Sequence, residues 1–439
     1  MSFRKYAPFV VFFTSAALQA EEPIRLQEQF PPGYQFHVSS RLSGTSTLFL
    51  PPDKDNPKGQ SLEMTGDSAI DYDERIMEAP ANGELQKTLR IYRRLEVQRS
   101  TGKEKMDSSL RPTVRRIVVT RANNLKNGFS PDGPLTYQEI ELLRTDVFTP
   151  ALAGLLPANA VRPGDTWKAT AEAEQELTDI EKLEGGSFDC KFEGVVTVAG
   201  SKQARVSLTG SVHGVDENGP CRHVVDGFFY FDLATNHLSY LTIRGTHFLL
   251  DKDGKETGKI EGTFTLSRRL DSRAAELSDA ALRGVALEPN DENTTLLFDN
   301  SELGVHFLYS RRWHINKIHG PQVMIDEARG TGNGFLITVE PLKNIPTAAQ
   351  FQAESEKFIT EQKGKILGTQ KPRPLAGSNN IEQFTLEADM AGQRVLLDYY
   401  IIRQAEGGAT IAAHILPRDI TSVRAEFERI AKSVVITKK

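Results

Sequence analysis

The chain has 439 residues, of which 39% are hydrophobic and 25% charged, and its formal net charge at pH 7 is −5. This length exceeds one ordinary domain, so we expect two or three. The acidic balance argues against a general nucleic-acid-binding protein, which needs surplus Lys and Arg to neutralise phosphates, and two cysteines exclude both a Cys₄ zinc site and a disulfide-dense mini-protein.

The first twenty residues have the pattern of a secretory signal peptide. Arg4 and Lys5 form a basic start, and Ala7 to Leu18 form an apolar stretch that is too short to span a bilayer as a helix. Small residues fit cleavage after Ala17 or after Ala20, and the sequence leaves that choice open. No later stretch is long and apolar enough to span a membrane. We therefore expect a secreted or periplasmic protein with no transmembrane span in the mature chain.

Residues 21–270 are expected to form one large, mainly antiparallel β domain. Its first part has strand-like runs at 34–43, 62–72, 84–98 and 114–121. A helix then begins at Thr136, where Glu139 has the capping-box spacing. After Asp165-Thr166-Trp167, a second series of strands is separated only by short turns, at 186–199, 203–213, 220–232, 237–250 and 258–268. Strands joined in this way pair as an antiparallel meander.

Residues 271–293 are expected to form a short helix and a linker, which ends in a Pro-Asn-Asp-Glu-Asn cluster. The remaining residues, 294–439, have the pattern of an α+β domain. Two amphipathic helices follow Thr347 and Asp419, and strands are expected at 304–310, 322–327, 334–342, 381–387, 393–403 and 409–416.

The last third of the chain, about 290–439, resembles PsbP-like domains. The resemblance rests on the opening strand and turn from Leu303 to Trp313, on the order of the later elements, and on the final helix around Phe427–Ser433. Arg311-Arg312 stand where the family usually has proline or glycine. The resemblance implies an α/β sandwich that binds a partner and is not catalytic, and no ligand-binding residue of the family has a counterpart here. Residues 21–270 faintly resemble the half-barrel of LppX-like lipoprotein carriers, which hold acyl chains on a concave face.

The fold class that follows is α+β, with a large, mainly antiparallel β N-terminal domain followed by a PsbP-like α/β sandwich domain.

The two cysteines, Cys190 and Cys221, are candidates for a disulfide, because two free cysteines are unusual in an oxidising compartment. A bridge would close a loop of about 30 residues and contribute roughly 3–4 kcal/mol. In a simple meander, however, the two residues lie on strands separated by one other strand, about 9–10 Å apart, whereas a bridge needs roughly 5.5 Å between Cα atoms. The sequence leaves the bridge open.

A histidine row is the sharpest candidate for chemistry. If the turns of the meander centre near residues 218 and 235, His213 opposes His223, His223 opposes His247, and Asp189 opposes His213. Such a row could hold zinc or copper. A shift of one residue would dissolve it, and unrelated surface histidines are the alternative that we favour.

A run of arginines offers a second candidate, a basic stripe for anionic lipid or polysaccharide, although such residues more often form a solvated face. Its members are Arg90, Arg93, Arg94, Arg111, Arg115 and Arg116. The sequence contains no His-Glu-x-x-His motif, no Gly-x-Ser-x-Gly motif and no phosphate-binding P-loop.

Together these features favour a non-catalytic, extracytoplasmic binding or assembly module of the cell envelope. We expect no cofactor and no nucleic acid, and a partner that is an unidentified protein or envelope component, with lipid as a further candidate. One alternative is a lipid or lipoprotein carrier that uses a concave β face. The other is a metal-dependent hydrolase centred on the histidine row.

Overall fold

A computed structural model describes residues 22–437, except 53, 55, 56, 58, 79–86, 123, 124, 271, 272, 329 and 331. The expected signal peptide, with both cleavage positions, lies outside the described residues. The chain divides into two units. The first contains residues 22–29 and Ala151–Lys259, and the second contains Phe30–Pro150 and residues 260–437.

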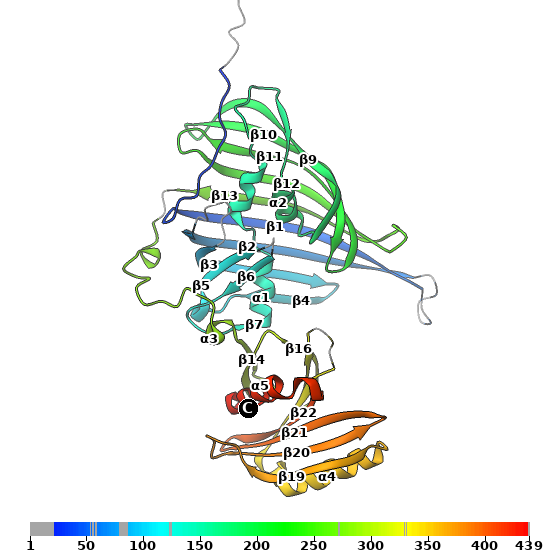
Figure 1. The fold of residues 1–439 in the computed structure, drawn as a ribbon. Helices are drawn as coiled ribbons and strands as arrows, with labels where there is room; N and C mark the ends of the chain where they lie inside the picture. The colour runs from blue at the N-terminus through cyan, green and yellow to red at the C-terminus, as the bar shows by residue number, and fades with distance from the viewer. Residues whose placement is uncertain are drawn as a thin grey trace, which may run out of the picture. The chain divides into compact units, whose positions relative to one another are not determined.

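The first unit is the expected antiparallel meander (Figure 1, green). Its strands are hydrogen-bonded in the order β8-β9-β10-β11-β12. They are β8 (Thr166–Lys168), β9 (Lys182–Val198), β10 (Ser201–Asp216), β11 (Gly219–Asp232) and β12 (His237–Leu250). The turn between β9 and β10 places both Ala199 and Gly200 at positive φ, 48° and 86°. Positive φ at both central residues is typical of a type I′ hairpin, which follows the right-handed twist of the strands.

Alternate residues of this meander are buried, among them Phe188, Leu208 and Val225. Helix α2 (Ala171–Thr178) packs on β9, where the Glu174 carboxylate accepts a 2.7 Å hydrogen bond from the Phe188 amide. The sequence analysis did not predict this helix. Its side chains are mostly acidic or small, and it lacks the long apolar stripe that marks an amphipathic helix.

The second unit begins with a sheet in the order β6-β5-β3-β2-β1-β13, to which β4 is added beside β3. The strands are β1 (Gln35–Leu50), β2 (Gln60–Glu78), β3 (Lys87–Thr101), β4 (Glu104–Ser109), β5 (Arg116–Ala122), β6 (Leu125–Phe129) and β13 (Glu256–Arg269). β1 and β2 pair without interruption from Gln35↔Arg75 to Leu50↔Gln60. They form a ribbon longer than the average strand pair.

Helix α1 (Tyr137–Arg144) begins as predicted, because the Thr136 hydroxyl and the Glu139 side chain form a complete capping box. Just before it, β7 (Leu135–Thr136) pairs in parallel with β14 (Leu296–Asn300). β14 belongs to a four-stranded sheet in the order β23-β15-β14-β7, with β15 (Val305–Tyr309) and β23 (Val435–Ile436). A segment before the expected linker thus shares a sheet with segments after it.

The C-terminal region contains a seven-stranded antiparallel sheet in the order β16-β17-β18-β22-β21-β20-β19. Its strands are β16 (Trp313–His319), β17 (Gln322–Glu327), β18 (Gly334–Glu340), β19 (Lys365–Pro374), β20 (Ile381–Met390), β21 (Gln393–Gln404) and β22 (Gly407–Ile415). Helices α4 (Ala348–Glu361) and α5 (Ile420–Ser433) pack into two separate hydrophobic clusters on opposite faces (Figure 1). This explains why β21 buries five consecutive residues, from Asp398 to Ile402.

Trp313 is buried where the chain turns into β16, as expected, with its ring centroid 5.0 Å from that of Phe427 on α5. Its indole N–H donates a 3.0 Å hydrogen bond to Glu426. The indole therefore joins β16 to the buried face of the last helix.

The expected α+β class, dominated by antiparallel strands, is confirmed. In the part of the chain that the structure describes, the remaining helical segments are α3 (Asp291–Thr294) and five 3₁₀ turns, at Pro112–Val114, Thr149–Leu155, Ala275–Leu277, Leu342–Asn344 and Pro417–Asp419. The domain boundary at 271–293 stays a prediction. Among the described residues, no helix has the length and apolar character needed to cross a bilayer.

Candidate functional site

One face of the β1–β2 ribbon changes from buried core to exposed apolar surface along its length. At one end this face carries Phe36, Val38 and Tyr72, all fully buried. Because directly opposed residues share a face, the same face continues to the other end of the ribbon. There it carries Leu42, Leu48, Leu50, Leu62 and Met64, which are exposed or only half-buried. We call these five residues the apolar strip.

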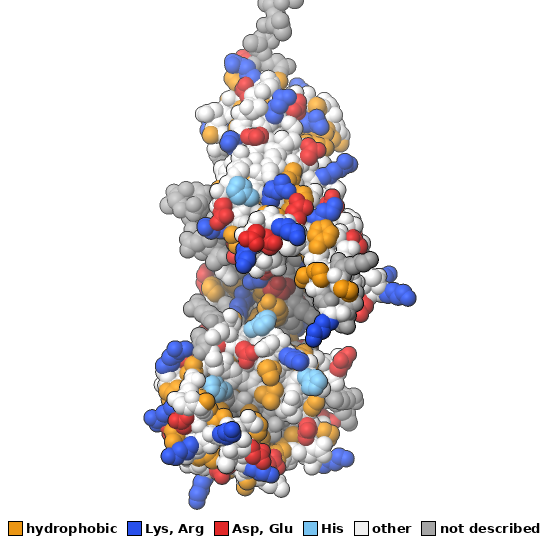
Figure 2. All heavy atoms as spheres, turned by 90° about the vertical axis from the view of Figure 1, so that its right-hand side faces the viewer, with side chains coloured by type: hydrophobic (Ala, Val, Ile, Leu, Met, Phe, Trp, Pro, Cys, Tyr) orange, Lys and Arg blue, Asp and Glu red, His pale blue; other side chains and the backbone are white. Residues whose placement is uncertain are grey.

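Ile260 of β13 extends the apolar strip sideways. It lies two residues from Gly262, where an added Cβ would lie 3.7 Å from the Leu42 side chain. Gly44 fits closely against the same strand, since a Cβ there would come within 2.7 Å of the Glu261 carbonyl oxygen. Leu42 and Ile260 are each 44% exposed. Figure 2 shows hydrophobic side chains gathered on the surface that it views.

The opposite face of the same ribbon is polar. Arg41 pairs with Asp71 at 2.9 Å, and Thr47 donates a 3.0 Å hydrogen bond to Glu63. Phe49, which is 46% exposed, is an exception on this face. The alternation along β1 and β2 therefore separates a charged face from an aliphatic one, even where neither face is buried.

The buried end of the ribbon contains a network of charged groups. Arg90 is fully buried and donates to Glu74 at 2.9 Å and to Asp146 at 2.8 Å. The Tyr92 hydroxyl also donates to Asp146, at 2.7 Å. Burial raises the pKa of Asp146 although Arg90 opposes this effect. Burial also raises the pKa of Tyr92, so the phenol remains neutral.

The predicted basic stripe is a set of ion pairs. Five of its six arginines contact carboxylates, and the sixth, Arg115, donates to the Pro112 carbonyl. The pairs are Arg90 with Glu74 and Asp146, Arg93 with Asp73 and Glu276, Arg94 with Glu96, Arg111 with Glu139, and Arg116 with Asp132. Five of these arginines thus already have anionic partners, and Arg90 is buried, so it does not lie on the solvated face that was the alternative interpretation.

The second unit also contains two cavities. A cavity of 720 Å³ is lined by residues that include Asp291, Glu426 and Arg429. A cavity of 290 Å³ is lined by residues that include Lys126 and Arg311. Arg311 donates to the carbonyl oxygens of Thr294 and Gly128. Both cavities mix charges of both signs with apolar side chains, and neither groups side chains in an arrangement that defines a reaction.

The predicted histidine row is half right. His223 opposes His247, as expected. His213 opposes Arg222 and Gly185 and is exposed, while Val212 opposes His223. Asp189 opposes Thr209. His213 and Asp189 are therefore not part of a row with His223 and His247.

The predicted disulfide is wrong. Cys190 and Cys221 are both buried and free. On β10, Cys190 opposes Leu208 and Cys221 opposes Gly214. These two positions on β10 are six residues apart, which corresponds to about 20 Å, far beyond the Cα separation that a bridge tolerates.

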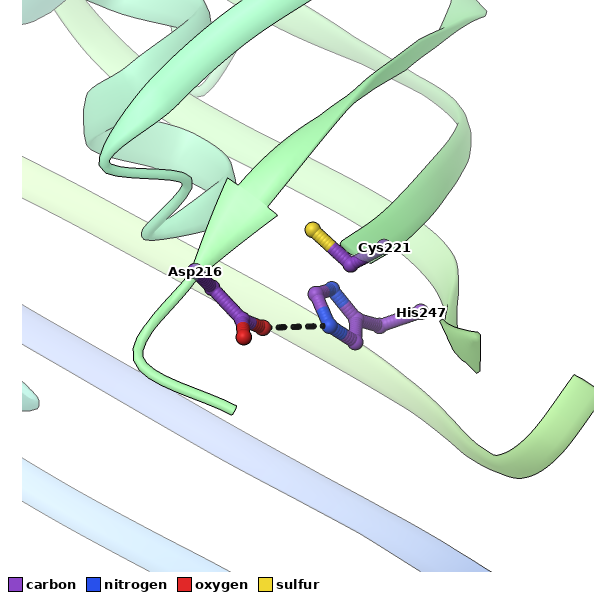
Figure 3. Close-up of side chains that lie close together, drawn as sticks. All are labelled: Asp216, Cys221 and His247. Carbon is purple, nitrogen blue, oxygen red and sulfur yellow. Dashed lines mark hydrogen bonds and ion pairs between the residues drawn. The ribbon is translucent and has the colours of Figure 1, made fainter. Parts of the chain in front are cut away.

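A different cluster takes the place of the row, where β10 ends and β11 begins (Figure 3). The His247 Nε2 atom lies 3.0 Å from the Asp216 carboxylate, and Cys221 completes a group whose ligand atoms all lie within 4.8 Å of one another. His247 Nδ1 lies 3.2 Å from His223 Nδ1. Burial, with a contribution from His247, lowers the pKa of His223 to about 4, and burial with Asp216 raises the pKa of Cys221 to about 11.

Sequence reasoning missed Asp216 and the apolar strip for different reasons. Asp216 lies at a turn, where Asp is common because its side chain caps backbone amides. It does so here with the amides of Asn218 and Gly219. The strip residues had a signal, the alternation of leucines with serines and glycines, but the same pattern is typical of an ordinary buried strand face.

No family model matches the chain, and no curated protein matches it. Among solved structures, cyanobacterial PsbP (CyanoP) from Synechocystis is 13% identical with a TM-score of 0.25, over 33% of this chain and 92% of that one. The Ran-binding protein Mog1p from Saccharomyces cerevisiae is 9% identical with a TM-score of 0.26, over 33% of this chain and 96% of that one. Lipovitellin is 10% identical with a TM-score of 0.29, over 56% of this chain and 26% of that one. The expected resemblance to PsbP is thus a weak likeness in fold, and no family is assigned.

Proposed function

We propose that this protein is a non-catalytic, extracytoplasmic binding protein that holds an acyl chain against the apolar strip. The observation that carries the proposal is that the core-bearing face of the β1–β2 ribbon stays aliphatic after it ceases to be buried. Exposed apolar side chains are ordinary when scattered over a surface, but several on one face of a strand pair favour an interaction surface.

The chemistry of the strip favours an acyl chain over a polar ligand. Its members are leucine, methionine and the neighbouring isoleucine. Between them lie serines and glycines, which project little from the sheet. Aliphatic side chains contribute about 25 cal/mol per Å² of apolar surface removed from water and require no hydrogen-bonding partner. Serine and glycine leave room for a chain to lie along the strands.

Neither the Arg90 network nor a metal-free Cys221 thiol supports a nucleophilic reaction. The network around Arg90 is fully buried and internally paired. The Cys221 thiol has a raised pKa, whereas a nucleophilic cysteine needs a lowered one.

A pair of substitutions with equal exposure tests the proposal. Leu42 on the apolar strip and Phe49 on the polar face lie on the same strand and are 44% and 46% exposed. We expect the native chain to bind a fluorescent fatty acid in a saturable titration. Leu42→Asp should weaken that binding at least tenfold, about 1.4 kcal/mol, because the carboxylate would lose water against the acyl chain.

Phe49→Asp is the matched control and should change the affinity less than twofold. Circular dichroism of both variants checks that the fold is retained. Absence of saturable binding by the native chain, or an equal loss in the two variants, would overturn the assignment.

A further inference from the structure

The geometry points to a zinc-binding site formed by Asp216, Cys221 and His247 in the first unit (Figure 3). The inference is independent of the acyl-chain proposal, because it rests on other residues and other chemistry. Within the described part of the chain, these are the only three histidine, cysteine or carboxylate side chains found with their ligand atoms within 4.8 Å of one another.

The distances fit a zinc ion after a small adjustment. Zinc binds Cys sulfur at about 2.3 Å, and binds His nitrogen and carboxylate oxygen at about 2.0–2.2 Å. In a tetrahedral site, these bond lengths place ligand atoms roughly 3.3–3.8 Å apart. The separation of 3.0 Å between His247 Nε2 and Asp216 Oδ2 must therefore widen by a few tenths of an ångström. The other separations between ligand atoms, which reach at most 4.8 Å, must shorten, and rotation of the side chains can bring this about.

The backbone holds the ligands in place from three strands. Asp216 ends β10 and is fixed by the hydrogen bonds from Asn218 and Gly219 to its other oxygen, Oδ1. Cys221 lies near the start of β11, and His247 lies near the end of β12, so a short turn and one strand pairing bring the three together. The exposed Glu217 and Asn218 of the turn leave this end of the sheet open to solvent.

His223 would hydrogen-bond to one of the ligands without binding the metal itself. When His247 binds metal through Nε2, its Nδ1 carries the proton and must donate it to an acceptor. The Nδ1 atom of His223 lies at hydrogen-bond distance, 3.2 Å. A neutral His223 provides the acceptor. We therefore assign His223 as a positioning residue and not as a ligand.

The charges also favour zinc. A carboxylate, a thiolate and a neutral imidazole carry two negative charges, which a divalent ion neutralises at a position where Cys221 is 1% exposed. Calcium and magnesium prefer oxygen ligands only, whereas a thiolate with an imidazole suits zinc. Binding releases the thiol proton of Cys221 to solvent, and three protein ligands leave the fourth position for water.

Cobalt(II) titration of the chelator-treated full-length protein tests the site directly. Cobalt replaces zinc in such sites, and a thiolate ligand produces an intense near-ultraviolet charge-transfer band. We expect this band to saturate at one equivalent of cobalt and to disappear when one equivalent of zinc is added. Cys221→Ser should abolish the band. His247→Gln should weaken zinc binding while the thiol remains in place.

The chain offers matched controls. Cys190→Ser removes the other buried cysteine of the same sheet, and His213→Gln removes a histidine from the opposite face of β10, so both should leave the band unchanged. His223→Phe should lower zinc affinity by about 10–100-fold while the band stays, because the thiolate still binds. Absence of the band in the native protein, or its loss in Cys190→Ser, would overturn the site.

Discussion

Replacing Arg90 by methionine should destabilise the protein far more than the same change at Arg94 on the same strand. Arg90 is fully buried and holds two carboxylates, Glu74 and Asp146, which are 0% and 2% exposed. Methionine keeps much of the side-chain volume but removes the positive charge. Both carboxylates would then remain inside the protein without a cation.

The magnitude follows from burial. Removing one partner of a buried charge network costs about 3–5 kcal/mol, because an uncompensated charge stays in a poorly solvating environment. The exposed pair of Arg94 with Glu96 has side chains that are 47% and 45% exposed, and such pairs contribute about 0–1 kcal/mol. The difference between the two variants should therefore be about 3 kcal/mol.

Urea unfolding followed by circular dichroism measures both variants against the native protein. The loss of stability in Arg90→Met should shrink as the pH falls from 7 towards 4, because protonation neutralises the buried Asp146 carboxylate, whose pKa burial already raises. Adding Glu74→Gln should restore part of the stability. Equal losses in the two arginine variants, or a loss that grows at low pH, would refute the reasoning.

Three further outcomes follow from the structure. Trp313→Ala should lower the free energy of unfolding by about 3–5 kcal/mol, since the indole is 2% exposed, and near-ultraviolet circular dichroism should show loosened packing around α5; an unchanged unfolding midpoint would contradict this. Burial raises the pKa of Asp232, but hydrogen bonds from Ser201, Thr235 and Ala234 outweigh it and bring the pKa to about 2. The stability from this group is thus complete above about pH 4 and lost between pH 4 and 2, about 2 kcal/mol in all, and acid unfolding of Asp232→Asn should lack that contribution. Both thiols should resist alkylation in the native protein and react only in denaturant, as read by mass spectrometry, because burial raises the pKa of Cys190 to about 12 and that of Cys221 to about 11.

The meander was predictable because its turns carry strong signals. All five long strands predicted between 186 and 268 are present, and their bounds in the structure differ from the predicted ones by four residues at most. Turn residues and alternating patterns are local properties, so they can be read from sequence. The same holds for the capping signal at Thr136 and for the helices expected after Thr347 and Asp419, although Asp419 precedes α5 without a side-chain cap.

Register was less predictable, and the histidine row shows why. The turn between β10 and β11 joins Asp216 to Gly219 through two residues, which centres the hairpin between 217 and 218. The expectation centred it on 218, and this half-residue difference moved His213 from His223 to Arg222. The expected pairing of Asp189 with His213 requires a β9–β10 turn centred on 201, whereas Val198 pairs with Ser201 and a bulge between Arg205 and Val206 shifts the register by one more residue, so that Asp189 opposes Thr209. A site assembled across strands depends on such registers, so its members cannot be fixed from local sequence.

Short or polar elements were missed for a related reason. α2, β14 and β19 have weak apolar periodicity, and they are fixed by what they pack against. β14 is the clearest case, since part of its pairing comes from Leu135 and Thr136, far away in the chain.

That parallel pairing has a consequence for how the molecule can be made and divided. During synthesis, β7 leaves the ribosome before β14 exists, so its hydrogen-bonding edge stays unpaired while more than a third of the chain is made, and such late, long-range contacts slow folding. A fragment cut at the predicted linker would separate the two strands and leave an open strand edge on each side. Open edges recruit other chains. Each half, if produced alone, is therefore expected to associate through these strands, and supplying the two halves together should suppress that association.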